Sequence, residues 1–396
     1  MSQAIRVHAF FQHMPPYSGA AALRGASIMV ALARCLEGRP HEVRVFTTIP
    51  APDTLPGITV RSIGTSEVEN ALSLAARIIG EFRMGWAAGR VMFDGKTHCD
   101  LAVISTPGYL AALLIAAAAR RRGVPYVLEL RDVYPQVYAE AGLLRRGSRL
   151  YRFFERRTHT MYAGARAVIA ATRGLARTVS EDVPHARVHP VYNGFPSKLL
   201  ARRAIKHARF TVCFHGVMGF FQDIETLVDV ARALVPLDVD MVVVGYGRKE
   251  TLIAEAGLPN LRFLGRQPFD ATVEQVERCH LGLCLRKDEE ISRDAFPVKV
   301  WECLGLGLPS IVTPMCEAGE FLEAEGCGVQ LPAGDVRRIV EQVMRLKDNP
   351  RELASLTERC RLVAERFTRE QTGLEAARLV EQCLWRPPET QSHGAT

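Results

Sequence analysis

The sequence predicts an α/β protein that is built from two doubly wound, Rossmann-like parallel-sheet domains in tandem. Its 396 residues exceed what one hydrophobic core usually organises. Short β-branched runs alternate with longer helical segments, which is typical of parallel sheets covered by helices. The same alternation begins again after the polar stretch SKLLARRAIKHA at residues 197–208, which indicates a second domain.

The first half supplies five predicted strands and at least three helices. The strands are Ile5–Phe11, Glu42–Thr47, Leu101–Ile104, Tyr126–Leu130 and Ala167–Ala170. The helices are Ala20–Leu36, Tyr109–Arg121 and a segment around Ser148–Gly164. The uncharged run at residues 101–119 approaches the length of a membrane span. Because Pro107-Gly108 interrupts it, we expect a buried strand, a turn and a buried helix instead.

The second half repeats this pattern. Its predicted strands are Phe210–Phe214, Asp240–Val244, Leu261–Phe263, Leu281–Leu285 and Ser310–Val312. Helices are predicted at Ile224–Leu234, Val298–Gly305 and Asp335–Leu346. Two such domains place a cleft between the carboxyl ends of their strands, where sheets of this kind bind ligands.

These elements define the expected domain boundaries. The first domain covers residues 1–196, the linker residues 197–208 and the second domain residues 209–366. The helix at residues 367–386 exceeds what the second domain needs, and we expect it to pack back on the first domain. Residues 387–396 are expected to form a flexible tail.

The charge of the chain is unevenly distributed. Residues 1–200 contain 25 Lys+Arg against 14 Asp+Glu, whereas residues 201–396 contain 25 against 29. The basic half indicates an anionic partner such as a phosphate or a membrane surface, and scattered solvated arginines are the alternative. No nucleic-acid-binding fingerprint accompanies the charge, so no nucleic acid is expected as a partner.

The cysteine pattern points to a reducing compartment. The ten cysteines include no C-x-x-C pair, which is typical of reduced core cysteines rather than a disulfide framework or a zinc site. The N-terminal sequence MSQAIRVHAFF runs directly into a strand and is no signal peptide. We therefore expect a cytoplasmic protein.

The most informative segment is DAFPVKVWECLGLGLP at residues 294–309. A helix that starts near Pro297 can bind a phosphate with its free N–H groups and its dipole. Lys299 adds a positive charge, and Glu302 can accept hydrogen bonds from ribose hydroxyls. The alternative is an amphipathic helix with its charged residues on a solvated face.

The same segment resembles the family-4 retaining glycosyltransferases of the GT-B fold. Their signature is Glu-x7-Glu, with Phe two residues after the first Glu and a G-x-P-V/I entry into the next strand. Here Asp294 replaces the first Glu, Phe296 lies two residues after it, and Gly307-Leu308-Pro309-Ser310-Ile311 follows Glu302. The P-x-K-x-x-E form resembles a bacterial branch that builds surface polysaccharides and includes aminosugar transferases.

Further segments carry the resemblance through the second half. Residues 214–223, with Gly216 and Gln222, resemble the G-x-x-G-x-x-Q loop that approaches the donor diphosphate in relatives. Many relatives have a basic residue in this loop, where this chain has Gln222 nearby. Gly245 belongs to a segment similar to vvGxG, and Arg266 to one similar to the v-x-F-l-G segment beside the nucleobase. The resemblance implies that these residues, with Lys299 and Glu302, bind the donor.

The first half matches the family at two strand ends. Residues 15–21, including Gly19, resemble its Gly-rich loop, and Arg24 follows in the first turns of the helix. The alternative for Arg24 is an ordinary surface position. Residues 129–135 resemble D-x-W-P, in which Asp132 could orient the acceptor or help take its proton. Alternatively, Arg131 and Asp132 cap the turn.

The resemblance implies a hexosyl- or N-acetylaminosugar transferase. The donor is a nucleotide sugar, with a UDP-sugar favoured, and the acceptor is a glycan or a lipid-linked sugar. Transfer retains the anomeric configuration and needs no metal or cofactor, with Asp132, Asp294 and Lys299 as the catalytic candidates. The alternatives are a sugar-nucleotide 2-epimerase of the same fold and a non-catalytic relative that binds a membrane or a partner.

A cluster of arginines accompanies these motifs. Six lie within residues Arg145–Arg157, interleaved with leucine, tyrosine and phenylalanine, and positions 145, 149, 152 and 156 share one helical face. Such a helix can lie on anionic lipid at the inner face of the cell membrane. The alternative is a solvated helix with its apolar side in the core.

Overall fold

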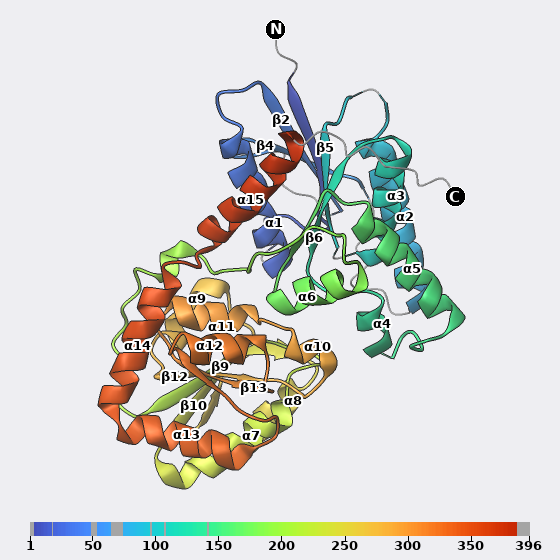
Figure 1. The fold of residues 1–396 in the computed structure, drawn as a ribbon. Coiled ribbons are helices and arrows are strands. Elements are labelled where there is room, and N and C mark those ends of the chain that lie inside the picture. Colours follow the sequence, from blue (N-terminus) through green and yellow to red (C-terminus); the bar gives the residue numbers. More distant parts are fainter. Residues whose placement is uncertain are drawn as a thin grey trace. The chain divides into compact units, whose positions relative to one another are not determined.

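The computed structural model describes residues 4–17, 19–48, 54–64, 74–95, 97–106, 108–140 and 142–385, without the side chains of residues 74–77. Ser18, Pro107 and the expected tail at residues 387–396 lie outside the described residues. The chain forms two compact units (Figure 1). Each unit is a largely parallel sheet with helices on both faces, which confirms the predicted fold class.

The first unit comprises Met1–Ala171, Leu175–Val191 and Thr372–Thr396. Over its described residues, the sheet has the strand order β3-β4-β2-β1-β5-β6-β7-β8, and only β3 and β4 pair antiparallel. The strands are β1 Ile5–Phe10, β2 His41–Thr47, β3 Thr54–Leu55, β4 Ile58–Ser62, β5 Leu101–Ser105, β6 Tyr126–Leu130, β7 Ala167–Ala170 and β8 Val188–Pro190. The helices that lie wholly or mostly in this unit are α1 Ala20–Cys35, α2 Leu74–Met92, α3 Tyr109–Arg121, α4 Gln136–Glu140, α5 Arg149–Ala163, α6 Arg173–Asp182 and α15 Arg369–Trp385.

The second unit comprises Thr172–Gly174 and Tyr192–Gln371. Its described strands are all parallel and have the order β11-β10-β9-β12-β13-β14. The strands are β9 Thr211–Met218, β10 Asp240–Gly247, β11 Leu261–Phe263, β12 Leu281–Leu285, β13 Ser310–Thr313 and β14 Gly328–Gln330. The helices are α7 Ile224–Leu234, α8 Glu250–Ala254, α9 Phe269–Val276, α10 Glu290–Arg293, α11 Val298–Gly305, α12 Glu317–Ala324, α13 Val336–Asp348 and α14 Pro350–Ala364.

The uncharged run at residues 101–119 forms β5 and the greater part of α3, as its turn residues predict. Strand β5 is buried along its whole length. Helix α3 buries its apolar side, including Ile115, against that strand. None of the described helices has both the length and the apolar character that a membrane crossing requires.

The unit boundaries differ from the expected ones at the end of the first domain. Residues 192–196, expected in the first domain, belong to the second unit. The reason is local pairing: Phe195 forms a parallel bridge with Thr368, and the N–H of Arg369 donates to the Phe195 carbonyl at 2.7 Å. From Thr372 onward the chain belongs to the first unit, where Val380 of α15 lies in the core with Val7 of β1.

Two glycines allow β9 and β10 to lie close together at their carboxyl ends. Gly216 and Gly245 are register partners, and Gly216 has a φ of 102°. A Cβ atom at Gly245 would lie 2.0 Å from the carbonyl oxygen of Gly216. That distance is far below any tolerated contact, so a side chain at Gly245 would force the two strands apart.

We therefore expect Gly245→Ala to lower the free energy of unfolding by about 1–3 kcal/mol, because of overpacking against backbone. The matched control is Gly219→Ala, where an added Cβ meets no atom within 4 Å. The control should change stability by less than about 0.5 kcal/mol. Urea unfolding measures both, and equal effects of the two variants would contradict the strand-packing role of Gly245.

Candidate functional site

Six residues lie together around the carboxyl ends of β9 and β10 and the start of α11. Five of them are donor-binding residues that the sequence predicts. We call the set the strand-end cluster, and it consists of His215, Gly216, Gln222, Gly245, Lys299 and Glu302. Carboxyl ends of parallel strands are where open α/β sheets bind ligands.

Lys299 is the central cation of the strand-end cluster. Its side chain is only 9% exposed, and its Nζ donates a hydrogen bond to Oε1 of Gln222 at 3.0 Å. The same Nζ lies 3.6 Å from the centre of the Phe214 ring. Among the described residues, no carboxylate oxygen lies within ion-pair distance of Lys299, so a neutral amide and an aromatic face hold its charge. Burial lowers the pKa of Lys299 to about 8.

Glu302 lies one turn further along α11 and pairs with a histidine. Oε2 of Glu302 is 2.9 Å from Nε2 of His215, and His215 is 5% exposed. Burial is the largest single influence and would lower the pKa of His215, but the hydrogen bond to Glu302, together with the charges of Cys303 and Glu302, raises the pKa above the ordinary value. His215 was not among the sequence-predicted site residues, although its position directly before Gly216 at a strand end could have indicated it.

The two helix starts near the cluster differ in how they are capped. At α7, the side chain of Asp223 accepts from the Thr226 N–H at 3.2 Å and from its hydroxyl at 2.7 Å. At α11, the N-cap residue Pro297 makes no such bond. The start of α11 is therefore the more favourable of the two for an anion, because no carboxylate caps it.

Arg286 is a second cation that the sequence did not single out. It follows β12 directly and forms an antiparallel bridge with Gln222. Its Nε donates to Oγ of the buried Ser292 at 3.3 Å, and its positive charge helps to lower the pKa of Lys299. An arginine at the end of a predicted strand was the signal that could have found it.

Two further predicted residues of the second unit lie at loops. Arg266 is exposed after β11, and its guanidinium lies 4.4 Å from the ring centre of Tyr246 at the end of β10. Because Gly245 donates to the Gly265 carbonyl at 2.9 Å, this loop lies beside the strand-end cluster. Asp294 is half-buried and follows α10 as its C-cap residue.

In the first unit, the predicted residues lie at the ends of β1 and β6. Gly19 is the N-cap of α1. Arg24 is 3% exposed, and its Nε donates to Oε1 of the buried Glu129 at 2.7 Å. This pair gives Arg24 an internal counter-charge, so it does not lie at the surface. Asp132 is half-buried just after β6.

The chain contains one Asp-x-Asp sequence, Asp238-Val239-Asp240. It lies at the amino end of β10, opposite the strand-end cluster, and both aspartates pair with Arg209 at 2.6 and 3.4 Å. Across the described residues, no group of three His, Cys, Asp or Glu side chains is placed to hold a metal ion.

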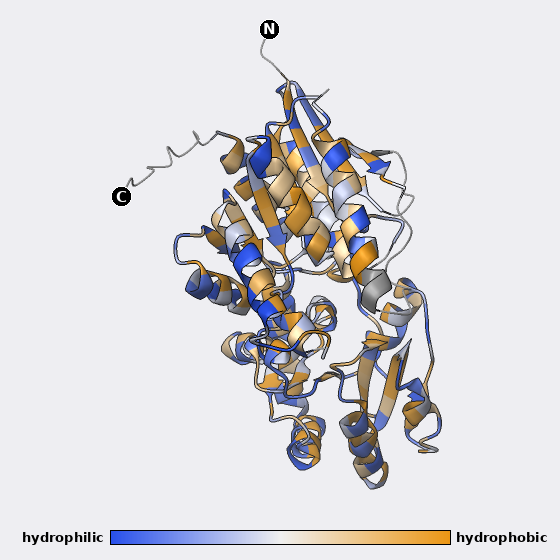
Figure 2. Ribbon diagram, turned by 90° about the vertical axis from the view of Figure 1, so that its right-hand side faces the viewer, coloured by the Kyte–Doolittle hydropathy of each residue, from blue (hydrophilic) through white to orange (hydrophobic). Residues whose placement is uncertain are grey.

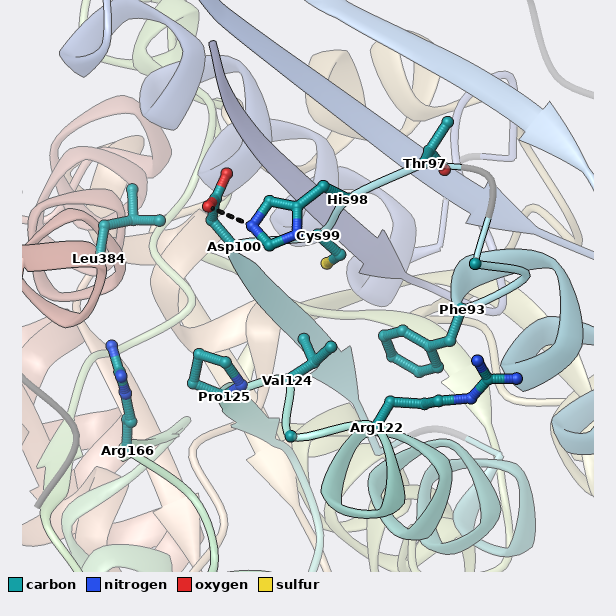
Figure 3. A pocket seen from close by; sticks show the side chains of 12 residues that line it. Phe93, Thr97, His98, Cys99, Asp100, Arg122, Val124, Pro125, Arg166 and Leu384 are labelled. Carbon is teal, nitrogen blue, oxygen red and sulfur yellow. Dashed lines mark hydrogen bonds and ion pairs between the residues drawn. The ribbon is translucent and has the colours of Figure 1, made fainter. Parts of the chain in front are cut away.

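A polar hollow of about 590 Å³ opens at the other end of the first sheet (Figure 3). It lies at the amino ends of β5 and β6, where Arg122, Arg166 and His98 line it. His98 bonds to Oδ1 of Asp100 at 2.9 Å, and Arg166 donates to the Cys383 carbonyl at 2.5 Å. The hollow therefore lies away from the strand ends that carry the predicted residues.

The expected basic helix differs in one respect from the prediction. Helix α5 begins only at Arg149, because Gly147 has a φ of 76° and Ser148 caps the helix by accepting from the Tyr151 N–H. Arg145 and Arg146 therefore precede the helix, and Arg145 does not share its face.

Two family models match the chain. Residues 25–199 match Glycosyltransferase Family 4, and residues 209–349 match Glycosyl transferases group 1. The chain belongs to the family 4 glycosyltransferases. It is thus an enzyme of glycosyl transfer with the GT-B fold, as the sequence resemblance implied.

Solved structures share the fold of this glycosyltransferase at low identity. Sucrose-phosphate synthase from Thermosynechococcus elongatus is 15% identical, with a TM-score of 0.74 over 96% of this chain and 98% of that chain. HepE of Anabaena in complex with UDP and glucose is 15% identical, with a TM-score of 0.65 over 96% and 100%. WaaG, a glycosyltransferase involved in lipopolysaccharide biosynthesis, is 15% identical, with a TM-score of 0.69 over 94% and 99%. A search of curated protein sequences finds no match.

The His215–Glu302 pair predicts a pH-dependent contribution to stability. Because the pKa of His215 is raised in the folded state, the contribution is complete below the ordinary value of 6.5 and is lost as the pH rises through the raised value. The free energy of unfolding lost in His215→Asn should therefore be larger at acidic pH than at alkaline pH.

His280→Asn is a control for which the pH dependence of the stability loss should have the opposite direction. Burial lowers the pKa of His280, whose Nδ1 accepts from the Thr211 N–H at 3.0 Å. Its contribution should be present above pH 6.5 and should fall as the pH drops below that ordinary value. Urea unfolding of both variants across this range measures the difference. Parallel pH dependences would contradict a charged His215–Glu302 pair.

Proposed function

We propose that this glycosyltransferase moves a hexosyl or N-acetylaminosugar group from a UDP-sugar to a glycan or lipid-linked acceptor, with retention of configuration. The observation that carries the proposal is the buried ammonium of Lys299, which neutral groups hold at the strand ends. A buried charge without a counter-ion is costly, and a bound diphosphate would supply that counter-ion. The UDP complexes of HepE and the role of WaaG in lipopolysaccharide biosynthesis support the donor and a place in surface polysaccharide or glycolipid assembly.

The cluster suggests how the leaving diphosphate would be stabilised. Negative charge grows on the diphosphate as the glycosidic bond breaks, and Lys299 and Arg286 would meet that charge in a poorly solvated site. Arg286 would supply the positive charge that a basic residue supplies in the corresponding loop of many relatives, where this chain has the neutral Gln222. Arg266, on the loop beside Gly245, is the third candidate cation.

The remaining predicted residues have separate roles in the proposal. Glu302 would accept hydrogen bonds from the ribose hydroxyls, while protonated His215 fixes the orientation of its carboxylate. The diphosphate itself would help to accept the acceptor proton in a front-face displacement. Asp132 would orient the acceptor hydroxyl, and Asp294 would lie on the donor side. No metal is required in this scheme, so chelation should leave turnover unchanged.

The direct test is donor binding and turnover with matched variants. Lys299→Gln should weaken UDP binding by about 10- to 100-fold, which is typical for the loss of a hydrogen bond to a charged group, and should affect uridine little. Glu302→Gln should instead reduce the preference for UDP over 2′,3′-dideoxy-UDP. Calorimetry measures both, and circular dichroism checks that the variants remain folded.

Three outcomes would contradict the proposal. One is full activity in both variants, and another is the absence of binding by any nucleotide sugar. The third is turnover of the nucleotide sugar without an acceptor, which would indicate the 2-epimerase activity. Proton NMR of the product shows the configuration at the anomeric carbon. Inversion there would contradict the retention of configuration but not the other parts of the proposal.

Donor affinity should depend on pH through Lys299. Its pKa of about 8 means that the free protein loses the positive charge above that pH, so UDP affinity should fall there by up to about tenfold per pH unit. Arg286→Gln should weaken binding at neutral pH and also shift the fall to higher pH, because a neighbouring positive charge is removed. The exposed Arg262→Gln is the control and should change neither property. A pH-independent affinity in the wild type would contradict the role of Lys299.

A further inference from the structure

Helix α2 exposes a stripe of large apolar side chains. Ile79, Phe82 and Trp86 are 57%, 55% and 59% exposed. Their spacing of three and four residues places them on one side of the helix. Scattered exposed apolar residues are ordinary, but a contiguous stripe marks an interaction surface.

Directly beside this stripe, α2 packs closely on α3. A Cβ atom at Gly85 would lie 2.6 Å from Cα of Ala111, and one at Gly89 would lie 3.3 Å from Cβ of Ala118. Met84, on the side of α2 that faces away from the stripe, is fully buried. The helix is thus fixed in its rotation, and the apolar stripe cannot turn inward.

The apolar surface continues across α3 onto α5. A groove of about 360 Å³ is lined by Phe82 of α2, Leu114 of α3 and Phe153 of α5, so the three helices share one surface. Phe153 is 49% exposed, and Leu150 beside it is 54% exposed. Figure 2 turns these helices toward the viewer and shows apolar and polar segments mixed across them.

The same surface is strongly basic. The three helices contain only two carboxylates, Glu81 and Glu155. Glu81 is 2% exposed and accepts from the Leu110 N–H at 3.0 Å, which leaves half-buried Glu155 as the acid nearest to solvent. Their exposed arginines are Arg83, Arg90, Arg120, Arg121, Arg149, Arg152, Arg156 and Arg157.

Arginines also lie directly against the exposed aromatic rings. The guanidinium of Arg90 is 5.3 Å from the Trp86 ring centre, and that of Arg157 is 5.2 Å from the Phe153 ring centre. Each pair places a cation beside a ring that is about half-exposed. This arrangement fits an interface where hydrocarbon meets anionic headgroups, because the ring can enter the apolar layer while the guanidinium binds a phosphate.

We infer that the joint face of α2, α3 and α5 docks on a bilayer of anionic phospholipid, with Ile79, Phe82, Trp86 and Phe153 entering the headgroup–acyl boundary. A nucleic acid would satisfy the arginines but would leave the apolar stripe in water. An acidic protein surface would leave the groove between α3 and α5 unfilled unless it also supplied apolar side chains. A bilayer satisfies both requirements over a broad area.

Flotation of the full chain with vesicles tests this inference, and it needs neither donor nor acceptor. A failure of the membrane-docking inference is therefore distinguishable from a failure of the proposed glycosyl transfer. The chain should float with phosphatidylcholine–phosphatidylglycerol vesicles, stay behind with phosphatidylcholine alone, and be released by high salt. Phe82→Ser/Trp86→Ser should reduce partitioning at least about tenfold, because two apolar side chains no longer enter the bilayer.

A control variant separates this surface from general hydrophobicity. Ile205→Ser/Leu362→Ser removes two side chains that are 90% and 53% exposed elsewhere, and it should float as the wild type does. Arg149→Gln/Arg152→Gln/Arg156→Gln should reduce partitioning by about fivefold per arginine. A blue shift of tryptophan emission on addition of anionic vesicles should disappear in Trp86→Phe.

The inference would be overturned if the wild type failed to bind anionic vesicles, or if both serine variants bound equally well. It would also be overturned if the wild type dimerised without binding vesicles and Phe82→Ser/Trp86→Ser made it monomeric. Sedimentation measures that outcome, which would assign the face to a second copy of the chain.

Discussion

The second unit is organised around one electrostatic constraint, the positive charge of Lys299 in a nearly buried position. Moving an ammonium ion out of water is expensive unless other groups replace the lost solvation. Here the amide oxygen of Gln222 and the face of the Phe214 ring replace part of it. Both groups are neutral, so the site retains a net preference for an anion. The pKa of Lys299 is lowered for the same reason, because burial disfavours the charged form and the ammonium group loses its proton more easily.

The backbone around this charge is shaped by glycine and by selective capping. Gly216 and Gly245 bring the ends of β9 and β10 together, which leaves room above them for the side chains of α11. Asp223 caps α7, whereas Pro297 leaves the start of α11 without a side-chain cap. The helix that carries Lys299 and Glu302 is consequently the one whose N-terminus is electrostatically suited to phosphate.

Sequence reasoning succeeded where local patterns decide the outcome. Strand β6, helix α7 and helix α11 have the predicted bounds, because continuous apolar runs and amphipathic periods are properties of the local chain. The bounds of helix α2 were not predicted, because Gly85 and Gly89, which fit against α3, lower the intrinsic helix propensity of this segment.

The motif residues of the candidate site could be predicted from the sequence, but the residues that form ion pairs and hydrogen bonds with them could not. The ion pair of Arg24 with Glu129 joins residues 105 positions apart, and the bond of Glu302 to His215 joins residues 87 apart. Local spacing cannot indicate such contacts, because the sheet order creates them. The bridge of Arg286 to Gln222 likewise arises because the segments that follow β9 and β12 lie side by side. It places an arginine beside the loop at residues 214–223, where many relatives have a basic residue in the loop itself.

A structure determined from crystals of the protein soaked with UDP would test most directly the claim that the strand-end cluster binds a diphosphate. The account predicts a diphosphate within hydrogen-bonding distance of Lys299 Nζ, close to Gly216 and the start of α11. It also predicts that the ribose hydroxyls contact Glu302. A nucleotide bound elsewhere, for example in the polar hollow beside Arg122 and Arg166, with the strand-end cluster empty, would contradict it.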